Sequence, residues 1–150
     1  MATGFKRPES VLVVIYTADL QVLLLERAKH PGYWQSVTGS REDSESFTET
    51  AIREVGEETG LSITTDQLVA WPGENVYEIM PEWRHRFAPE VTHNLERVFS
   101  LCLPKVCAIT LSATEHRAWR WVSQAEAAAA CFSASNREAI LQLATISTSL

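Results

Sequence analysis

One helical segment near the middle of the chain constrains the fold more than any other feature. Ser46 is followed three residues later by Glu49, the pattern of a capping box at a helix start. Apolar residues then recur at helical spacing, and Gly60 is a natural stop because the residue that ends a helix in a left-handed conformation is usually glycine. The sequence therefore predicts a helix over residues 47–59 whose apolar face packs on another element.

Three glutamates crowd the C-terminal end of this predicted helix. Glu54, Glu57 and Glu58 are spaced by three and four residues, so a helix places them on one face. Like charges at these spacings repel by about 0.2–0.5 kcal/mol per pair, and the helix dipole disfavours negative charge at this end. A divalent cation bound by the carboxylates would offset both effects. Two interpretations remain open at this point, a metal site and a solvated acidic helix end.

The remaining patterns predict a mixed sheet with helices on its faces. The run at 10–17 is rich in β-branched residues and predicts a central strand, with 22–27 as its partner. Further strands are predicted at 34–39, 67–71, 75–80, 97–103 and 116–122. A short helix is predicted at 123–132, and a second capping box, Ser135 with Glu138, opens a last helix whose apolar residues are Ile140, Leu141, Leu143 and Ala144. The expected class is α/β (α+β).

Composition excludes several classes of protein. The 150 residues suit one domain, and no apolar run approaches the length of a membrane span. A formal net charge of −6 argues against a nucleic-acid-coating protein, while a polyphosphate ligand remains compatible if cations lie between ligand and protein. The N-terminus lacks the apolar core of a secretory signal, and three cysteines without metal spacing indicate a reduced, cytoplasmic protein. The oligomeric state is not readable from these features.

Residues 39–61, GSREDSESFTETAIREVGEETGL, resemble the Nudix box. The matching positions are Gly39, Glu45, Arg53, Glu54, aliphatic Val55, Glu57, Glu58, Gly60 and aliphatic Leu61. Many members have a second glycine where this chain has Ser40. The resemblance implies the Nudix fold, an α/β/α sandwich with a mixed sheet in which the box forms a loop–helix–loop, and a single domain over residues 1–150.

The same resemblance implies an activity and its residues. Nudix hydrolases cleave a diphosphate linked to another group and depend on Mg²⁺ or Mn²⁺. The implied catalytic residues are Arg53, Glu54, Glu57, Glu58 and Glu115, and all four glutamates are implied metal ligands. Glu115 comes from outside the box, just before a predicted strand. Arg53 is expected to orient the ligands together with Glu45, because a guanidinium can hold a carboxylate with two hydrogen bonds.

Segments outside the box resemble one bacterial branch of the family. They include KRPESVLVVIY, WQSVTGS, RHRFAPEVTHNLE, TEHRAWRW and SNREAI, and they spread over residues 6–140. The branch hydrolyses dihydroneopterin triphosphate to dihydroneopterin monophosphate and diphosphate in folate biosynthesis, which implies a small-molecule substrate. Two alternative substrates remain open, nucleoside triphosphates at low selectivity and dinucleoside polyphosphates, the latter favoured by the position of Tyr77. A domain that binds without hydrolysis is a further alternative, but it should lack metal glutamates that are all present here.

The resemblance to this branch also implies a set of substrate-binding residues. They are Lys6, Arg27, Thr38, Tyr77, Glu78, Ile79, Met80 and Ser135. The two cations suit a triphosphate, with surface salt bridges as the alternative. Residues 77–80 suit a flat heterocycle, with plain core packing as the alternative. The basic cluster at 84–86 is compatible with both a phosphate contact and a solvated loop.

Overall fold

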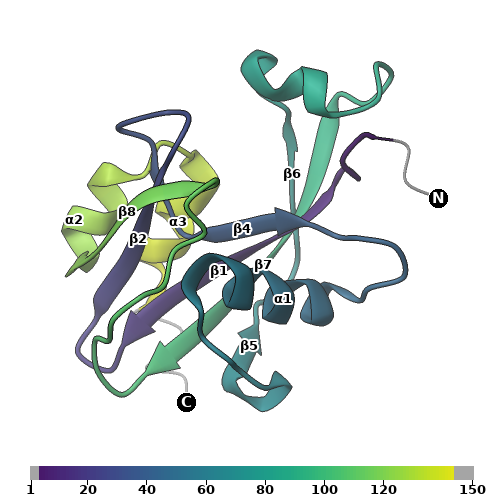
Figure 1. Ribbon diagram of the computed structural model, residues 1–150. Coiled ribbons are helices and arrows are strands. Elements are labelled where there is room, and N and C mark those ends of the chain that lie inside the picture. Colours follow the sequence, from purple (N-terminus) through teal and green to yellow (C-terminus); the bar gives the residue numbers. More distant parts are fainter. Residues whose placement is uncertain (1–3, 144–150) are drawn as a thin grey trace.

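The chain forms a mixed sheet flanked by helices on both faces, as the computed structural model shows (Figure 1). The structure describes residues 4–143. Its strands are β1 (Glu9–Thr17), β2 (Gln21–Arg27), β3 (Trp34–Gln35), β4 (Val37–Ser40), β5 (Leu68–Ala70), β6 (Asn75–Glu78), β7 (His93–Leu103) and β8 (His116–Ser123). Its helices are α1 (Phe47–Thr59), α2 (Gln124–Ala130) and α3 (Ala134–Leu141), with 3₁₀ turns η1 (Thr65–Gln67) and η2 (Pro81–Arg86).

Strand β1 lies at the centre of the sheet. It pairs in parallel with β7 over its whole length, while its other edge pairs antiparallel with β4 and then with β2. The change of partner follows from the register, because β4 faces residues 10–13 and β2 faces Tyr16. β8 extends the sheet beyond β2, and β5 and β6 pair with β7.

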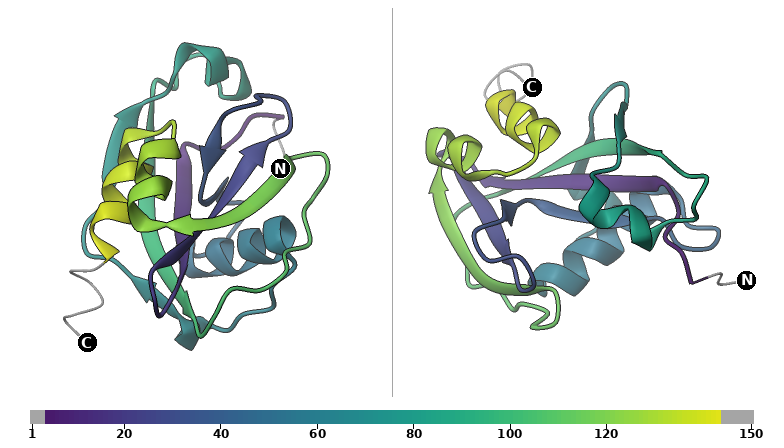
Figure 2. Two further views of the ribbon diagram at one scale, coloured as in Figure 1. Left: turned by 90° about the vertical axis from the view of Figure 1, so that its left-hand side faces the viewer. Right: turned by 90° about the horizontal axis from the view of Figure 1, so that it is seen from above.

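Both faces of β1 are buried, which explains its continuous apolar sequence. Even-numbered residues such as Leu12 and Val14 pack with α2 and α3, whereas odd-numbered residues such as Val13 and Ile15 pack with α1. Figure 2 shows α1 on one side of the sheet and the other two helices on the opposite side. The predicted sandwich of a mixed sheet between helices is confirmed.

Helix α1 has the ends that the sequence predicts. Ser46 accepts a hydrogen bond from the backbone N–H of Glu49, and the Glu49 carboxylate accepts one from the backbone N–H of Ser46. Gly60 ends the helix with φ 78°, in the left-handed region. A Cβ at Gly60 would also lie 2.9 Å from the Thr110 side chain, so glycine is required for both conformation and space.

The last helix starts earlier than the sequence predicts. Ser133, not Ser135, is the N-cap of α3 and accepts from the backbone N–H of Asn136, so the expected capping box at Ser135 is wrong. Leu141 was expected on the apolar face but is 56% exposed, because the buried face runs through Asn136, Ala139, Ile140 and Leu143. Ile140 and Leu143 are buried as expected, and Ala144 lies outside the described residues.

The predicted strand at 34–39 is interrupted by a buried polar pair. Ser36 separates β3 from β4. Its backbone N–H donates to Asn136 Oδ1 at 2.8 Å, and Asn136 Nδ2 donates to Ser36 Oγ at 2.9 Å. A partner from α3, a hundred residues away, thus replaces the sheet bond at this position. Strand β7 also begins four residues before the predicted start at 97, and residues 84–86 belong to η2 rather than to an open loop.

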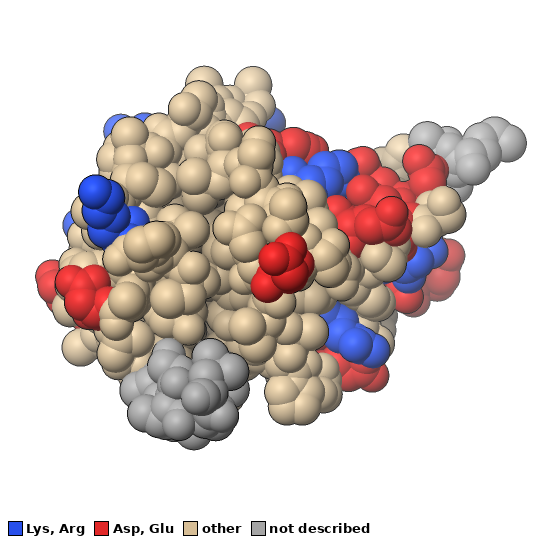
Figure 3. Space-filling model, turned by 90° about the horizontal axis from the view of Figure 1, so that it is seen from below, with Lys and Arg blue, Asp and Glu red and all other residues tan. Residues whose placement is uncertain are grey.

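Surface charge and helix length agree with the composition. On the face drawn in Figure 3, Lys and Arg side chains are scattered, while acidic side chains gather toward one edge. That face does not offer the continuous basic area that a nucleic-acid-coating protein needs. Within residues 4–143, no helix combines the length and the apolar character required to cross a bilayer.

Candidate active site

Arg53 organises the acidic end of α1. Its guanidinium binds Glu45 through two hydrogen bonds, Nε to Oε2 at 2.6 Å and Nη2 to Oε1 at 3.0 Å. The same group donates to the backbone carbonyl of Ser40 at 3.0 Å. The hydrogen bond from Arg53 is the main reason that the pKa of Glu45 is lowered to about 2. The loop before the helix is therefore tied to the helix through a permanently ionised pair, as the sequence predicts.

Two of the predicted metal glutamates also contact Arg53. Its Nη1 donates to Glu54 Oε1 at 2.7 Å and to Glu57 Oε1 at 3.1 Å. The Glu54 carboxylate is buried and the Glu57 carboxylate is about half exposed. Both carboxylates are thus held on the side of the helix that carries Arg53, close to the loop at Ser40.

Glu58 is the most deeply buried of the glutamates. Its side chain is 2% exposed, and its Oε1 has no hydrogen-bond partner. Burial raises the pKa of Glu58 well above its usual range, and the neighbouring Glu54 carboxyl raises it further. His116 Nε2 lies 3.9 Å from Glu58 Oε1, but burial lowers the pKa of His116 to about 4, so the imidazole is neutral near pH 7. Among residues 4–143, Glu58 therefore forms no ion pair with a permanently charged side chain.

Gly39 permits the close approach of Glu54 to the sheet. A Cβ at position 39 would lie 2.1 Å from the Glu54 carboxyl carbon, well inside van der Waals contact. The Gly39 backbone is not in the left-handed region, so space alone requires glycine here. Glycine at the start of the box thus determines where the first carboxylate of the helix lies.

Glu115 approaches the same region from the start of β8. Its backbone carbonyl accepts a hydrogen bond from the N–H of Ala28 at 2.9 Å, which fixes the loop beside β2. Partial burial raises the pKa of Glu115, and the negative charges of Glu54 and Glu57 raise it further. Glu115 therefore lies near enough to Glu54 and Glu57 for their negative charges to act on its carboxyl group.

The chemistry of the acidic cluster fits a divalent cation. Within residues 4–143, no three His, Cys, Asp or Glu side chains are gathered as a ready ligand set, and Glu54 and Glu57 both accept hydrogen bonds from Arg53. Nevertheless, Glu58 presents a buried oxygen without a partner beside the Glu54 carboxyl. Carboxylate oxygens are the ligands that Mg²⁺ and Mn²⁺ prefer, and a cation would offset the burial and the repulsion that raise the pKa values of Glu58 and Glu115.

A cavity of about 800 Å³ opens next to Glu58 and Glu115. All eight predicted substrate-binding residues line it, namely Lys6, Arg27, Thr38, Tyr77, Glu78, Ile79, Met80 and Ser135. Glu58 and Glu115 are also in its wall, whereas Arg53, Glu54 and Glu57 lie outside the lining. The structure therefore brings residues from seven separated parts of the sequence to one cavity beside the acidic cluster.

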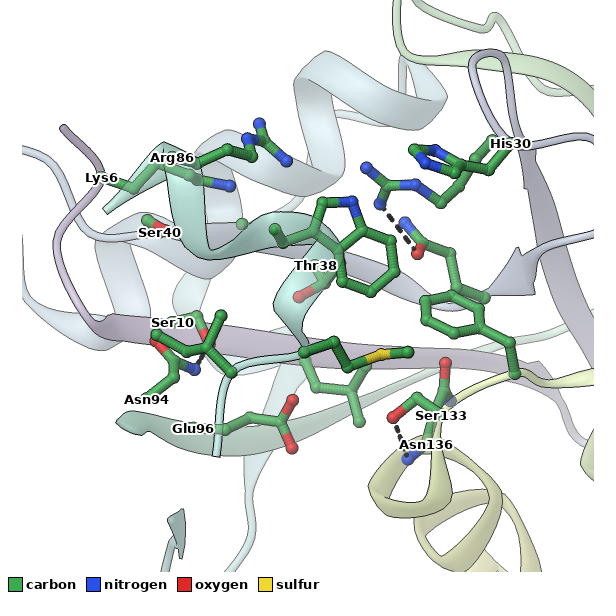
Figure 4. Close-up of a pocket in the computed structure, with 18 of the residues that line it drawn as sticks. Lys6, Ser10, His30, Thr38, Ser40, Arg86, Asn94, Glu96, Ser133 and Asn136 are labelled. Carbon is green, nitrogen blue, oxygen red and sulfur yellow. Dashed lines mark hydrogen bonds between the residues drawn. The ribbon is translucent and has the colours of Figure 1, made fainter. Parts of the chain in front are cut away.

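One end of the cavity is basic. Lys6 and Arg86 lie together there (Figure 4), and the backbone N–H of Lys6 donates to the carbonyl of Arg86 at 2.8 Å. Burial and repulsion from Arg86 lower the pKa of Lys6 to about 8. Arg27 lines the same cavity, stacks over Trp83 at 5.1 Å, and has a buried Nε without a partner. Of the sequence cluster at 84–86, His85 and Arg86 line the cavity, a question that the residue pattern left open.

The opposite part of the cavity carries uncharged and acidic groups. Thr38 is fixed by donating its hydroxyl proton to the Val11 carbonyl at 2.9 Å. Tyr77 accepts a hydrogen bond from Asn94 Nδ2 at 3.1 Å, and burial raises the pKa of Tyr77 to about 12. Ile79 is buried, and Met80 is 40% exposed at the rim. These surroundings suit a neutral ring better than a phosphate.

Sequence reasoning missed several residues of this cavity. They include Ser10, Gln35, Trp83, Asn94, Glu96, His116 and Phe132. Asn94 and Glu96 carried a usable signal, since polar residues alternate there just before the apolar part of β7. The others come from segments that are distant in the sequence, and no local pattern predicts that these segments lie side by side.

Comparison with known proteins agrees with this fold and site. The NUDIX domain family matches residues 6–143, so the chain belongs to the Nudix family and is a Nudix hydrolase. It is 45% identical to dihydroneopterin triphosphate diphosphatase of Escherichia coli K12 over 141 residues, covering 92% of this chain and 93% of that protein. It is 41% identical to the protein of the same name in Haemophilus influenzae, covering 91% of this chain and 87% of the relative.

The fold is also similar to a solved structure. The E. coli dihydroneopterin triphosphate pyrophosphohydrolase superimposes with a TM-score of 0.86 at 44% sequence identity. The superposition covers 92% of this chain and 95% of the other. The similarity thus extends over the cavity as well as over the box helix.

Proposed function

We propose that this protein hydrolyses dihydroneopterin triphosphate to dihydroneopterin monophosphate and diphosphate, with Mg²⁺ as the preferred cation. The observation that carries the proposal is one cavity with a basic end, a neutral end and a buried carboxylate cluster beside it. A triphosphate suits the basic end and a pterin ring suits the neutral end. Relatives at 41% and 45% identity bear the name of this activity.

The acidic and basic residues of the site would have separate roles in catalysis. Glu54, Glu57, Glu58 and Glu115 hold the cation, which neutralises phosphate oxygens and activates water when bound. Arg53 keeps Glu54 and Glu57 in place through its bonds to both carboxylates and to Glu45. Lys6 and Arg27 bind the triphosphate, with Arg suited to two simultaneous contacts to phosphate oxygens.

The neutral part of the cavity would hold the ring. Thr38 and Ser135 offer polar contacts, and residues 77–80 form a wall along it. The single domain is proposed to span residues 1–150 and to act in the cytoplasm, in keeping with its three free cysteines. The proposed partners are small molecules rather than nucleic acids or membranes.

The substrate assignment is tested by comparing kcat/KM for dihydroneopterin triphosphate, dATP, GTP and a diadenosine polyphosphate, each with Mg²⁺. We expect the pterin substrate to be turned over with the highest kcat/KM, and chromatography of the products to show monophosphate and diphosphate. Equal or better turnover of any nucleotide would overturn the substrate assignment while leaving membership of the family intact. Release of inorganic phosphate in place of diphosphate would contradict the proposed products.

A further inference from the structure

Glu96 places a buried carboxylate inside the cavity at the part away from Lys6 and Arg86 (Figure 4). It lies on β7, and its cross-strand neighbours are Ser10 on β1 and Asn75 on β6. The residue is 3% exposed. Asn75 Nδ2 donates to Glu96 Oε1 at 3.2 Å, and no ion pair joins Glu96 to another described residue. Burying a carboxylate without a paired cation costs folding free energy, so we expect Glu96 to have a function in the cavity.

Asn94 adds a second acceptor on the same face of β7. Residues two apart on a strand point to the same side, so Asn94 and Glu96 both face the cavity. Asn94 Nδ2 donates to Ser10 Oγ at 2.8 Å and to the Tyr77 hydroxyl at 3.1 Å. Its Oδ1 is buried and has no hydrogen-bond partner. The strand thus places the Glu96 carboxylate in the cavity wall next to a buried amide oxygen of Asn94 that has no partner.

The Glu96 carboxylate determines which hydrogen-bonding groups a ligand needs at this part of the cavity. An ionised carboxylate only accepts hydrogen bonds, and it can accept two from adjacent N–H groups. Burial raises the pKa of Glu96, and hydrogen bonds from Asn75 and Ser135 partly oppose this effect. Further N–H donors from a ligand would favour the ionised form in the same way. A ring with two neighbouring N–H donors on one edge therefore complements this part of the cavity.

We propose that Glu96 determines ring specificity by accepting two hydrogen bonds from the edge of a 2-amino-4-oxopyrimidine ring. The donors are the ring N–H next to the oxo group and the adjacent 2-amino group. This inference rests on the proposed function, because the pterin ring has this edge. Guanine has the same edge, hypoxanthine lacks the amino group, and adenine places an acceptor nitrogen where the ring N–H would be.

The test combines one nearly isosteric variant with two nucleotides that differ by one amino group. Glu96→Gln replaces one acceptor oxygen by a donor NH₂, which then faces a donor of the ring. We expect kcat/KM for dihydroneopterin triphosphate to fall at least about tenfold, mainly through KM, because a hydrogen bond to a charged group contributes that much or more. Glu138→Gln, an exposed glutamate outside the cavity, is the matched control and should behave as wild type.

The nucleotide pair supplies a measurement that a purely structural role of Glu96 would not change. GTP and ITP are compared as inhibitors of dihydroneopterin triphosphate hydrolysis. We expect GTP to inhibit the wild-type enzyme about tenfold more strongly than ITP, and Glu96→Gln to bring that ratio close to one. Equal inhibition of the wild type, or an unchanged ratio in the variant, would overturn the proposal.

Failure of the proposed function is distinguishable from failure of this inference. If wild type does not hydrolyse the pterin substrate, the proposed function fails. If wild type hydrolyses it and Glu96→Gln keeps its kcat/KM, only the role of Glu96 fails. A thermal melt shows whether Glu96→Gln folds. If the variant does not fold, the proposal is decided by the relative strength of inhibition by GTP and ITP, measured on the wild-type enzyme alone.

Discussion

Lys6 shows how the tertiary structure changes the pKa of a single side chain. The lysine belongs to the N-terminal segment before β1, yet it lies in the cavity wall beside Arg86. Burial, followed by repulsion from Arg86, lowers its pKa to about 8. A lysine with a lowered pKa loses its charge as pH rises through that value. The proposed triphosphate contact is therefore complete below about pH 8 and is lost above it.

The corresponding prediction concerns the pH dependence of kcat/KM, which reports groups of the free enzyme. For the wild type, kcat/KM should fall by about tenfold between pH 7.5 and pH 9.5, the effect of losing one charged contact. Lys6→Arg should shift that fall to higher pH, because arginine stays protonated. Lys105→Arg, an exposed lysine outside the cavity, is the control. An identical alkaline limb in Lys6→Arg would exclude Lys6 as its cause.

In helix α1, the residues that stabilise the helix and the residues proposed for catalysis lie at opposite ends. Its N-terminus is closed by Ser46 and Glu49, whereas its C-terminal half carries the acidic cluster. Gly39, on the neighbouring β4, fixes the position of the first carboxylate by leaving room for Glu54. Changes at the two ends of this unit should therefore have different effects.

We expect Gly39→Ala to lower kcat by at least about a hundredfold, because the new methyl displaces the Glu54 carboxyl and a misplacement of about 1 Å is that costly. Its free energy of unfolding should change little, since the displaced group is the end of a side chain. Ser46→Ala should instead lose about 0.5–2 kcal/mol of stability with kcat unchanged. Urea denaturation and steady-state kinetics measure both quantities. A fully active Gly39→Ala enzyme would contradict the role given to Gly39.

At the scale of the whole molecule, the acidic cluster links cation binding to stability. Glu58 has a raised pKa in the folded state. The stability contributed by its protonated form is therefore lost as pH rises from the ordinary glutamate range through that raised pKa. A bound cation offsets this effect because it binds the folded state alone.

The prediction is a thermal shift. Mg²⁺ at a hundred times its Kd should stabilise the wild type by about 2.7 kcal/mol, which raises Tm by several degrees in a domain of this size. Glu58→Gln should melt at an equal or higher temperature than wild type without Mg²⁺, show a smaller Mg²⁺ shift, and lose several orders of magnitude in kcat. Calorimetry with and without Mg²⁺ measures the shifts. A Glu58→Gln variant with the wild-type Mg²⁺ shift and rate would refute the metal role.

The sequence by itself determined the features that depend on near neighbours in the chain. The capping box at Ser46, the stop at Gly60 and the doubly buried strand β1 follow from local patterns, and the structure confirms them. The resemblance to the Nudix box also named Glu54, Glu57 and Glu58, and the resemblance to one branch of the family named the substrate-binding residues. The location of the eight substrate-binding residues in one cavity, with Glu58 and Glu115 in its wall, agrees with these resemblances, while the roles remain predictions.

Only the tertiary structure decided the features that depend on contacts between distant segments. Asn136 interrupts the strand at Ser36, Ser133 replaces Ser135 as the cap of α3, and Arg86 joins Lys6 at the cavity. The burial that raises the pKa of Glu96 comes from packing of β7 against the rest of the sheet and the α3 side. Burial and charge proximity are properties of the packed chain, so a local pattern cannot assign them.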